Sequence, residues 1–148
     1  MRLSALRDSP HAFLHKYEDE SGFDEARWRQ EFIRGDWYVR TVTGRPADEP
    51  VGLVGITREP STPAQHCFLE YLWVAPECRG RGVAFGMINY VLGLLRKSAV
   101  RTVFLWVLDN NDRAARLYKR AGFVSCNYRQ PLEDRPERSE ELMQLDLV

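Results

Sequence analysis

The hydrophobic pattern changes its period near the middle of the chain, and this change predicts a strand followed by a helix. Residues 69–74 form an apolar, aromatic-rich run typical of a strand, and Pro76 interrupts the run. Beyond the next turn the apolar residues take up helical spacing and share one face: Val83, Met87, Ile88, Val91, Leu92 and Leu95. We therefore predict a strand at about 67–74 and a helix that begins near Val83.

A capped helix and two strands are predicted ahead of this segment. Asp24 precedes an amphipathic run, which predicts a helix over 25–34 with an acidic N-cap. Residues 37–43 and 51–57 have strand character, and the turn-forming segment 44–50 separates them. This arrangement predicts an antiparallel hairpin.

Four further elements are predicted after the central helix. The run 102–108 is almost continuously apolar, as expected of a strand that is covered on both faces. A helix over 111–122 and a strand over 123–130 follow, and the polar segment 131–139 is predicted to be a loop. Apolar and polar residues alternate over 143–147, as an edge strand would require.

The order of these elements predicts the fold class. A short amphipathic helix over 2–8 opens the chain, and strands alternate with helices in its second half. We expect a mixed α/β fold, with a mostly antiparallel central sheet flanked by helices and parallel pairing between the 67–74 and 102–108 strands. At 148 residues the chain is expected to form one domain, 1–148.

Composition narrows the function classes. Twenty-one basic and 21 acidic residues balance, which argues against a nucleic-acid or anionic-membrane binder, so the basic residues near 79–81 and 113–120 are interpreted as local sites. Three cysteines without a CxxC pair and three scattered histidines give no zinc-ligand spacing, so no metal site is expected. Free thiols and the lack of a signal-like N-terminus predict a cytoplasmic protein.

Glycines and arginines between the central strand and helix predict an anion-binding site. The sequence there is Arg79-Gly80-Arg81-Gly82. Amides of a first helical turn lack intrahelical acceptors, the helix dipole favours negative charge, and arginines suit phosphate. The Walker pattern is absent, and the dinucleotide fingerprint fails where Phe85 stands at its third glycine.

Two motifs together resemble one family. Arg79, Gly82 and Ala84 form an Arg-x-x-Gly-x-Ala pattern that resembles the pyrophosphate-binding motif of the GNAT superfamily of N-acetyltransferases. A later segment resembles the second motif of that family through these residues: Asn111, Ala114, Leu117, Tyr118, Gly122 and Phe123. The motifs occur in the family's order and at its usual separation, and the resemblance extends over roughly residues 36–148.

The resemblance implies acetyl-CoA as co-substrate. Its pyrophosphate would be held at the turn by Arg79 and by the backbone at these positions: Gly80, Arg81, Gly82, Val83 and Ala84. In the family the preceding strand splays from its parallel neighbour, and its free backbone groups bind the pantetheine arm; here these belong to Leu72, Trp73 and Val74. One such amide would polarise the thioester carbonyl. The alternative is that 72–74 is ordinary core strand, and their side chains are expected to be core.

Three residues are candidates for further roles. Tyr118 corresponds to the tyrosine that the family often uses as general acid toward the CoA thiolate, and the alternative is a tyrosine that simply packs at the helix face. Asn111 is expected to touch the CoA arm, to cap its helix, or both. Glu70 is the best-placed acidic residue to accept the amine proton, although a salt bridge at a strand end would explain it equally well. No catalytic role is expected for Cys78.

Two questions stay open at this point. The family fold normally starts with a strand ahead of its first helix, whereas this chain begins inside that helix. Either the start is truncated or the sheet edge is completed differently, and this leaves open one edge of the sheet and the contacts of a homodimer. The leading hypothesis is direct acetyl transfer from acetyl-CoA to a primary amine, borne by a small molecule or a peptide. The alternatives are a non-catalytic module that binds acyl-CoA and a nucleotide-binding α/β protein.

Overall fold

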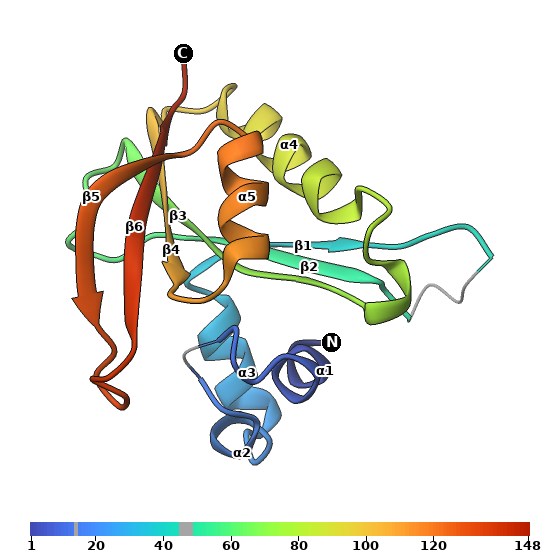
Figure 1. Ribbon diagram of the computed structural model, residues 1–148. Coiled ribbons are helices and arrows are strands. Elements are labelled where there is room, and N and C mark those ends of the chain that lie inside the picture. Colours follow the sequence, from blue (N-terminus) through green and yellow to red (C-terminus); the bar gives the residue numbers. More distant parts are fainter. Residues whose placement is uncertain (14, 45–48) are drawn as a thin grey trace.

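A six-stranded sheet with the order β1-β2-β3-β4-β6-β5 organises the computed structural model, which describes residues 1–13, 15–44 and 49–148 (Figure 1). The strands are β1 (Gly35–Arg40), β2 (Gly52–Thr57), β3 (His66–Val74), β4 (Thr102–Leu108), β5 (Val124–Pro131) and β6 (Ser139–Asp146). Only the β3–β4 pair is parallel, and the other neighbours are antiparallel. The predicted mixed, mostly antiparallel sheet is therefore confirmed.

Helices flank this sheet in two groups. They are α1 (Arg2–Asp8), α2 (Tyr17–Glu20), α3 (Glu25–Phe32), α4 (Val83–Leu95) and α5 (Asp112–Arg120), with a short 3-10 turn, η1 (Pro76–Cys78). Figure 1 shows α4 and α5 in front of the sheet and α1, α2 and α3 gathered below it. In the described ranges no helix has the length and apolar character needed to cross a bilayer.

The core lies between the sheet and the helices α4 and α5. Ile88 and Leu92 of α4 and Tyr118 of α5 share one buried cluster with the alternate β4 residues Val103 and Leu105. The opposite face of β4 carries aromatic residues, which pack on aromatic residues of β3 and β5: Phe104 on Phe68, and Trp106 on Tyr128. Both faces of β4 are thus covered, as its continuous apolar run predicts.

The predicted hairpin and capped helix are both present. β1 and β2 pair in antiparallel register from Gly35↔Thr57 to Arg40↔Gly52. The predicted turn over 44–50 falls partly on residues 45–48, which lie outside the described residues. At the start of α3, the Asp24 carboxylate accepts a hydrogen bond from the Arg27 amide at 2.8 Å. Within the described residues β1 is an edge strand, since β2 is its one paired neighbour.

The C-terminal strand was predicted to be an edge strand, and this prediction is wrong. β6 lies between β4 and β5, and β5 forms the edge. Alternation of apolar and polar residues does not distinguish the two positions when one face of the sheet is polar. The polar residues of β6 find partners on β5: Glu141 pairs with Arg129 at 3.1 Å, and Glu140 accepts from Gln130 at 2.7 Å. The two end residues of the predicted loop 131–139 belong to strands: β5 ends at Pro131, and β6 begins at Ser139.

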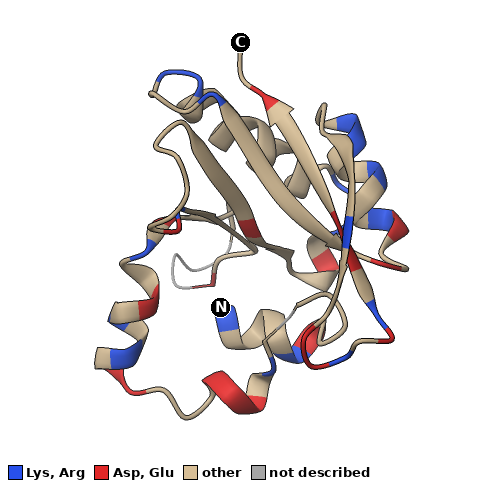
Figure 2. Ribbon diagram, turned by 90° about the vertical axis from the view of Figure 1, so that its left-hand side faces the viewer, with Lys and Arg blue, Asp and Glu red and all other residues tan. Residues whose placement is uncertain are grey.

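Acidic and basic residues alternate over most of the molecule, although basic residues are concentrated along α5 (Figure 2). Figure 2 therefore agrees with the balanced composition, 21 basic and 21 acidic residues. A duplex or an anionic membrane would select an extended basic face. Attraction of a charged ligand is therefore expected from local groups of charged residues rather than from the net charge of the protein.

Candidate active site

The parallel strands β3 and β4 diverge, and a cavity opens where they part. Their pairing runs from His66↔Thr102 to Phe68↔Phe104 and ends there. Beyond Phe68 a cavity of about 630 Å³ is lined by residues 69–74 of β3 and by 106–108 at the end of β4. The splay that the family resemblance implied is therefore present. It leaves backbone groups of Leu72, Trp73 and Val74 beside the cavity, without a β4 partner.

A bulge interrupts β3 at the residues that line this cavity. Leu53 pairs with Trp73 and Gly55 with Glu70, so that two β3 residues oppose a single β2 residue. Tyr71, in the bulge, adopts a positive φ of 59°, which costs a non-glycine residue about 1–2 kcal/mol. Its ring packs on Trp37 with centroids 4.7 Å apart. Gly55 lies against both rings, and an added Cβ at this position would crowd them, at 3.1 Å from the Tyr71 ring and 3.2 Å from the Trp37 ring.

The turn before α4 presents free backbone amides to the cavity. Gly80 and Gly82 have φ values of 75° and 78°, and Gly82 is the N-cap residue of α4, without a side-chain cap hydrogen bond. The first intrahelical bond runs from the Gly86 amide to the Gly82 carbonyl, so the amides of Val83 and Ala84 have no intrahelical acceptor. Since no acidic residue lies in the first turn, nothing there competes with a bound anion.

Arg79, predicted to contact phosphate, is engaged in holding this turn together. Its Nε donates to the Val74 carbonyl at 2.9 Å, and its Nη2 pairs with the Asp8 carboxylate of α1. Asp8 also accepts a hydrogen bond from Trp73 Nε1 at 3.0 Å. Burial raises the pKa of Asp8, but hydrogen bonds from Ser9, Trp73 and Arg79 outweigh burial and hold it below its ordinary value. Arg79 therefore links β3 to α1, and its contact with phosphate stays a prediction.

Replacement of Arg79 by alanine should therefore cost stability. We expect Arg79→Ala to lower the free energy of unfolding by about 2 kcal/mol, because it removes a charge-assisted bond and leaves Asp8 without its ion pair. Since the folded pKa of Asp8 is lowered, this contribution is present above the unfolded pKa and is lost as the pH falls through the folded pKa. The matched control is Arg81→Ala at the exposed neighbour. Equal losses in urea titrations of both variants would contradict the assigned role.

The helix α5 brings two predicted residues to the same cavity. Asn111 caps α5, since its Oδ1 accepts from the Ala114 amide at 3.3 Å; a CoA contact for Asn111 stays a prediction. Tyr118 is buried, lines the cavity and packs on Phe123 with centroids 6.0 Å apart. Burial raises the pKa of Tyr118 to about 12. Its phenol therefore remains protonated near neutral pH.

Glu70 of β3 is half-buried and also lines the cavity. Its Oε2 accepts a hydrogen bond from the Thr57 hydroxyl at 2.8 Å. Burial raises the pKa of Glu70 above its ordinary value, and the Thr57 hydrogen bond opposes that shift only in part. A carboxylate with a raised pKa in a cavity is a candidate general base.

The family model of the acetyltransferase (GNAT) family matches residues 3–123 of the chain. This chain belongs to the GNAT acetyltransferase family. The match covers the splayed strand, the glycine turn and α5, all of which contribute residues to the cavity.

Similar proteins agree on the fold. An uncharacterized N-acetyltransferase of Methanocaldococcus jannaschii is 40% identical over 52 residues, 35% of this chain and 23% of that protein. The chain spans about a quarter of the length of the curated relatives it matches. The ribosomal-protein-S18-alanine N-acetyltransferase from Escherichia coli has a TM-score of 0.70 at 18% identity, covering 99% of this chain and 88% of that chain. An acetyltransferase of Bacillus subtilis in complex with CoA has a TM-score of 0.67 at 16% identity, covering 84% and 85% of the two chains.

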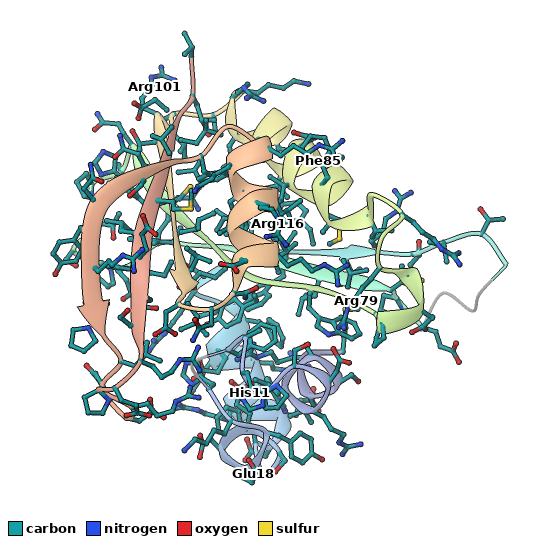
Figure 3. The ribbon with its side chains drawn as sticks, viewed as in Figure 1. His11, Glu18, Arg79, Phe85, Arg101 and Arg116 are labelled. Carbon is teal, nitrogen blue, oxygen red and sulfur yellow. The ribbon has the colours of Figure 1, made fainter. Side chains whose placement is uncertain are left out.

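A row of arginines on α5 completes the lining of the GNAT cavity. Arg113, Arg116 and Arg120 all line it, and within the described part of the chain no ion pair to an acidic residue is recorded for them. Arg120 lies over the Phe85 ring of α4 at 4.4 Å. Figure 3 shows Arg116 on α5 and Arg79 at the turn before α4, and both residues line the same cavity. The signal in the sequence was the basic segment 113–120, whose spacing of three and four residues defines one helical face.

Histidine, cysteine and acidic side chains form no metal-binding group in the described ranges. There, no cluster of three histidine, cysteine or acidic side chains has the placement to hold a metal ion. Cys78 is buried beside the glycine turn, and Cys67 is buried in the core. Burial raises the pKa of Cys67 to about 11, which disfavours its reactive thiolate form.

Proposed function

We propose that this protein transfers an acetyl group from acetyl-CoA directly to a primary amine. The observation that carries the proposal is the convergence of three features on one cavity: the free amides of α4, the splayed strand β3, and two titratable groups in its lining, Glu70 and Tyr118. Family membership supports acetyl transfer as the reaction class. An amine-bearing small molecule or peptide would be the acceptor.

The residues present fit coenzyme A in size and charge. The cavity of about 630 Å³ lies within the ~300–1,000 Å³ of typical ligand pockets. Val83 and Ala84 would donate amide hydrogen bonds to the pyrophosphate, and the arginines of α5 would face the remaining phosphate charge. The backbone groups of 72–74 that lack a β4 partner would bind the pantetheine amides in the manner of an added strand. A backbone amide of this strand would also polarise the thioester carbonyl.

Tyr118 would act on the departing thiolate as a hydrogen-bond donor. Its pKa of about 12 exceeds that of a free thiol, roughly 8.5, by about 3.5 units or about 5 kcal/mol. Complete proton transfer from the phenol to the sulfur is therefore uphill, whereas a hydrogen bond to the developing charge is favourable. The family resemblance implied that Tyr118 acts as a general acid; we propose the more limited role of a hydrogen-bond donor to the thiolate.

Glu70 would prepare the amine for attack. A primary amine with a pKa near that of lysine, about 10.4, is mostly protonated at neutral pH and cannot attack in that form. When bound, acetyl-CoA supplies the activated acetyl group: a C–N bond forms, the thioester C–S bond breaks, and the sulfur leaves with the bond's electron pair. The ammonium gives up one proton before attack, directly or through water to Glu70, which passes it to solvent. A second proton leaves the nitrogen for Glu70 as the amide forms, and the thiolate takes up one proton, so that one proton is released to solvent overall.

Release of free thiol from acetyl-CoA in the presence of amines tests the proposal. We expect amine-dependent thiol release, with acetylated amine formed in equal amount. Binding of CoA without turnover across small amines and peptides would instead support the alternative, a non-catalytic acyl-CoA-binding module. Thermal stabilisation by ATP or NAD with indifference to acetyl-CoA would support a nucleotide-binding protein.

A tyrosine variant tests the role of the phenol. Tyr118→Phe is expected to lower kcat about 10- to 100-fold, the kinetic equivalent of one hydrogen bond to a charged group. The Kd of CoA should not change, because the phenol meets only developing charge. Tyr90→Phe on the exposed side of α4 is the control, and it should leave both constants unchanged. Full activity of Tyr118→Phe would remove this residue from the mechanism.

A further inference from the structure

A second, smaller cavity adjoins the first, and its walls combine aromatic rings with charged side chains. Its volume is about 230 Å³, less than the ~300–1,000 Å³ of a complete ligand pocket. Five rings line it: Phe23, Trp28, Phe32, Trp37 and Tyr71. Arg2, His15 and Tyr71 line both cavities. The smaller cavity is therefore suited to one part of a ligand whose other part lies in the larger cavity.

The five rings form a continuous row, and none of them belongs to the buried core clusters. Successive centroids lie 5.2 Å apart for Phe23–Trp28, 5.8 Å for Trp28–Phe32, 4.5 Å for Phe32–Trp37 and 4.7 Å for Trp37–Tyr71. All five residues are partly buried against one another. The helix α3, which carries Trp28 and Phe32, contains no fully buried residue. Its apolar face thus lines the cavity, and concave sites lined by aromatic side chains are typical of small-molecule binding.

Charges around the small cavity are mostly paired with one another. Arg2 bonds Glu20 through Nε at 2.9 Å and Nη2 at 2.7 Å, and its guanidinium lies 4.5 Å from the Tyr71 ring centre. Arg27 pairs with Glu31 at 2.8 Å. For Arg34, no ion pair is recorded with any residue that the structure describes. The remaining charge is positive, so a ligand with a second ammonium group would be disfavoured there.

We infer that the small cavity holds the aromatic body of the acceptor, so that the acceptor class is a small arylalkylamine with one amino group. The inference rests on the proposed acetyl transfer. Tyr71 follows Glu70 directly in β3, and both line the larger cavity. A ring stacked in the aromatic row would therefore direct its amino group, through a short alkyl linker, to the junction beside Glu70. Stacking and apolar burial would supply the selectivity.

Three amines test this inference with acetyl-CoA as donor. We expect kcat/KM for 2-phenylethylamine to exceed that for n-butylamine about tenfold, because the ring adds apolar and stacking contacts. Putrescine should be the poorest of the three, because it carries a second positive charge. Titration of the CoA-bound protein with 2-phenylethylamine should also change its tryptophan fluorescence, since Trp28 and Trp37 line the cavity.

Variants on α3 locate the ring. Trp28→Ala should raise KM for 2-phenylethylamine about five- to tenfold and leave kcat/KM for n-butylamine and the Kd of CoA unchanged. Ile33→Ala is the matched control at a position that is 85% exposed and outside both cavities; it should change nothing. The unchanged Kd of CoA also shows that a variant is folded, and the fluorescence titration of the unmodified protein does not depend on any variant.

Different failures have different meanings. Equal kcat/KM for the three amines, or a ring preference retained in Trp28→Ala, would overturn the inference while leaving acetyl transfer intact. Preference for a peptide N-terminus over 2-phenylethylamine would also overturn it. Absence of turnover with every amine would defeat the proposed function, and the acceptor class would fall with it.

Discussion

Gly82→Glu is expected to abolish measurable binding of CoA. Gly82 is the N-cap residue of α4, and an added Cβ meets nothing within 4 Å, so the new side chain would stand at the mouth of the helix. Its carboxylate would lie where the account places a doubly charged pyrophosphate, and like charges at such a distance repel strongly. It would also interact with the free amides itself, in competition with the ligand. We expect an increase in Kd of at least about 100-fold, measured by calorimetry.

Two control variants separate charge from backbone strain at this position. Gly82 has a φ of 78°, which any L-residue adopts at some cost, but which asparagine tolerates better than most. Gly82→Asn therefore adds a neutral side chain with modest strain and should weaken binding only severalfold. Gly86→Glu adds the same charge one turn further along α4, at an exposed position outside the cavity, and should bind CoA nearly as the unmodified protein does. Retained affinity in Gly82→Glu would refute the site.

Glu70→Gln should produce the largest loss of turnover among variants that still bind CoA. Glutamine keeps the size of the side chain and can still accept the Thr57 hydrogen bond, but it cannot take up a proton. We expect kcat to fall about 100- to 10,000-fold at neutral pH, the usual contribution of a general base. The deficit should shrink at high pH, where more of the amine is already neutral. A steady-state pH profile of both proteins, with the Kd of CoA as control, measures these effects.

The same variant is expected to be at least as stable as the unmodified protein. Burial raises the folded pKa of Glu70, so the folded protein holds this proton more tightly than the unfolded chain. Its contribution to stability is therefore present below the unfolded pKa, about 4.3, and is lost as the pH rises through the folded pKa. At neutral pH the ionised side chain is destabilising, and Glu70→Gln relieves this. A higher Tm at pH 7 that converges with the unmodified protein near pH 4 would fit, whereas a lower Tm at pH 7 would indicate a structural role.

The sequence contained enough information for the individual strands and helices and for the glycine turn, but not for the full strand order. Periodicity alone predicted the hairpin, the continuous β4 run and the apolar face of α4, because hydrophobic spacing follows directly from the geometry of each element. The glycine pair before α4 predicted the exposed amides, since only glycine adopts those φ values freely. These features are local in the chain. They need no knowledge of distant partners.

Features that depend on distant partners were not predictable. The positive φ of Tyr71 has no sequence signal, because it is maintained by packing on Trp37 and by the space at Gly55. Arg79 matched a phosphate motif, yet its partner Asp8 lies on α1, 71 residues away in the sequence. The interior place of β6 depended on pairing with two strands, which alternation alone does not encode.

An NMR titration of the amide-labelled protein with CoA can locate the cofactor directly. Backbone donors at the start of α4 would hold the pyrophosphate, and the side of β3 that lacks a β4 partner would hold the pantetheine arm. The amide resonances of Gly82, Val83 and Ala84 should therefore shift most, together with those of residues 72–74, and saturate at a single Kd. Saturation with CoA while these amides remain unshifted would contradict the account.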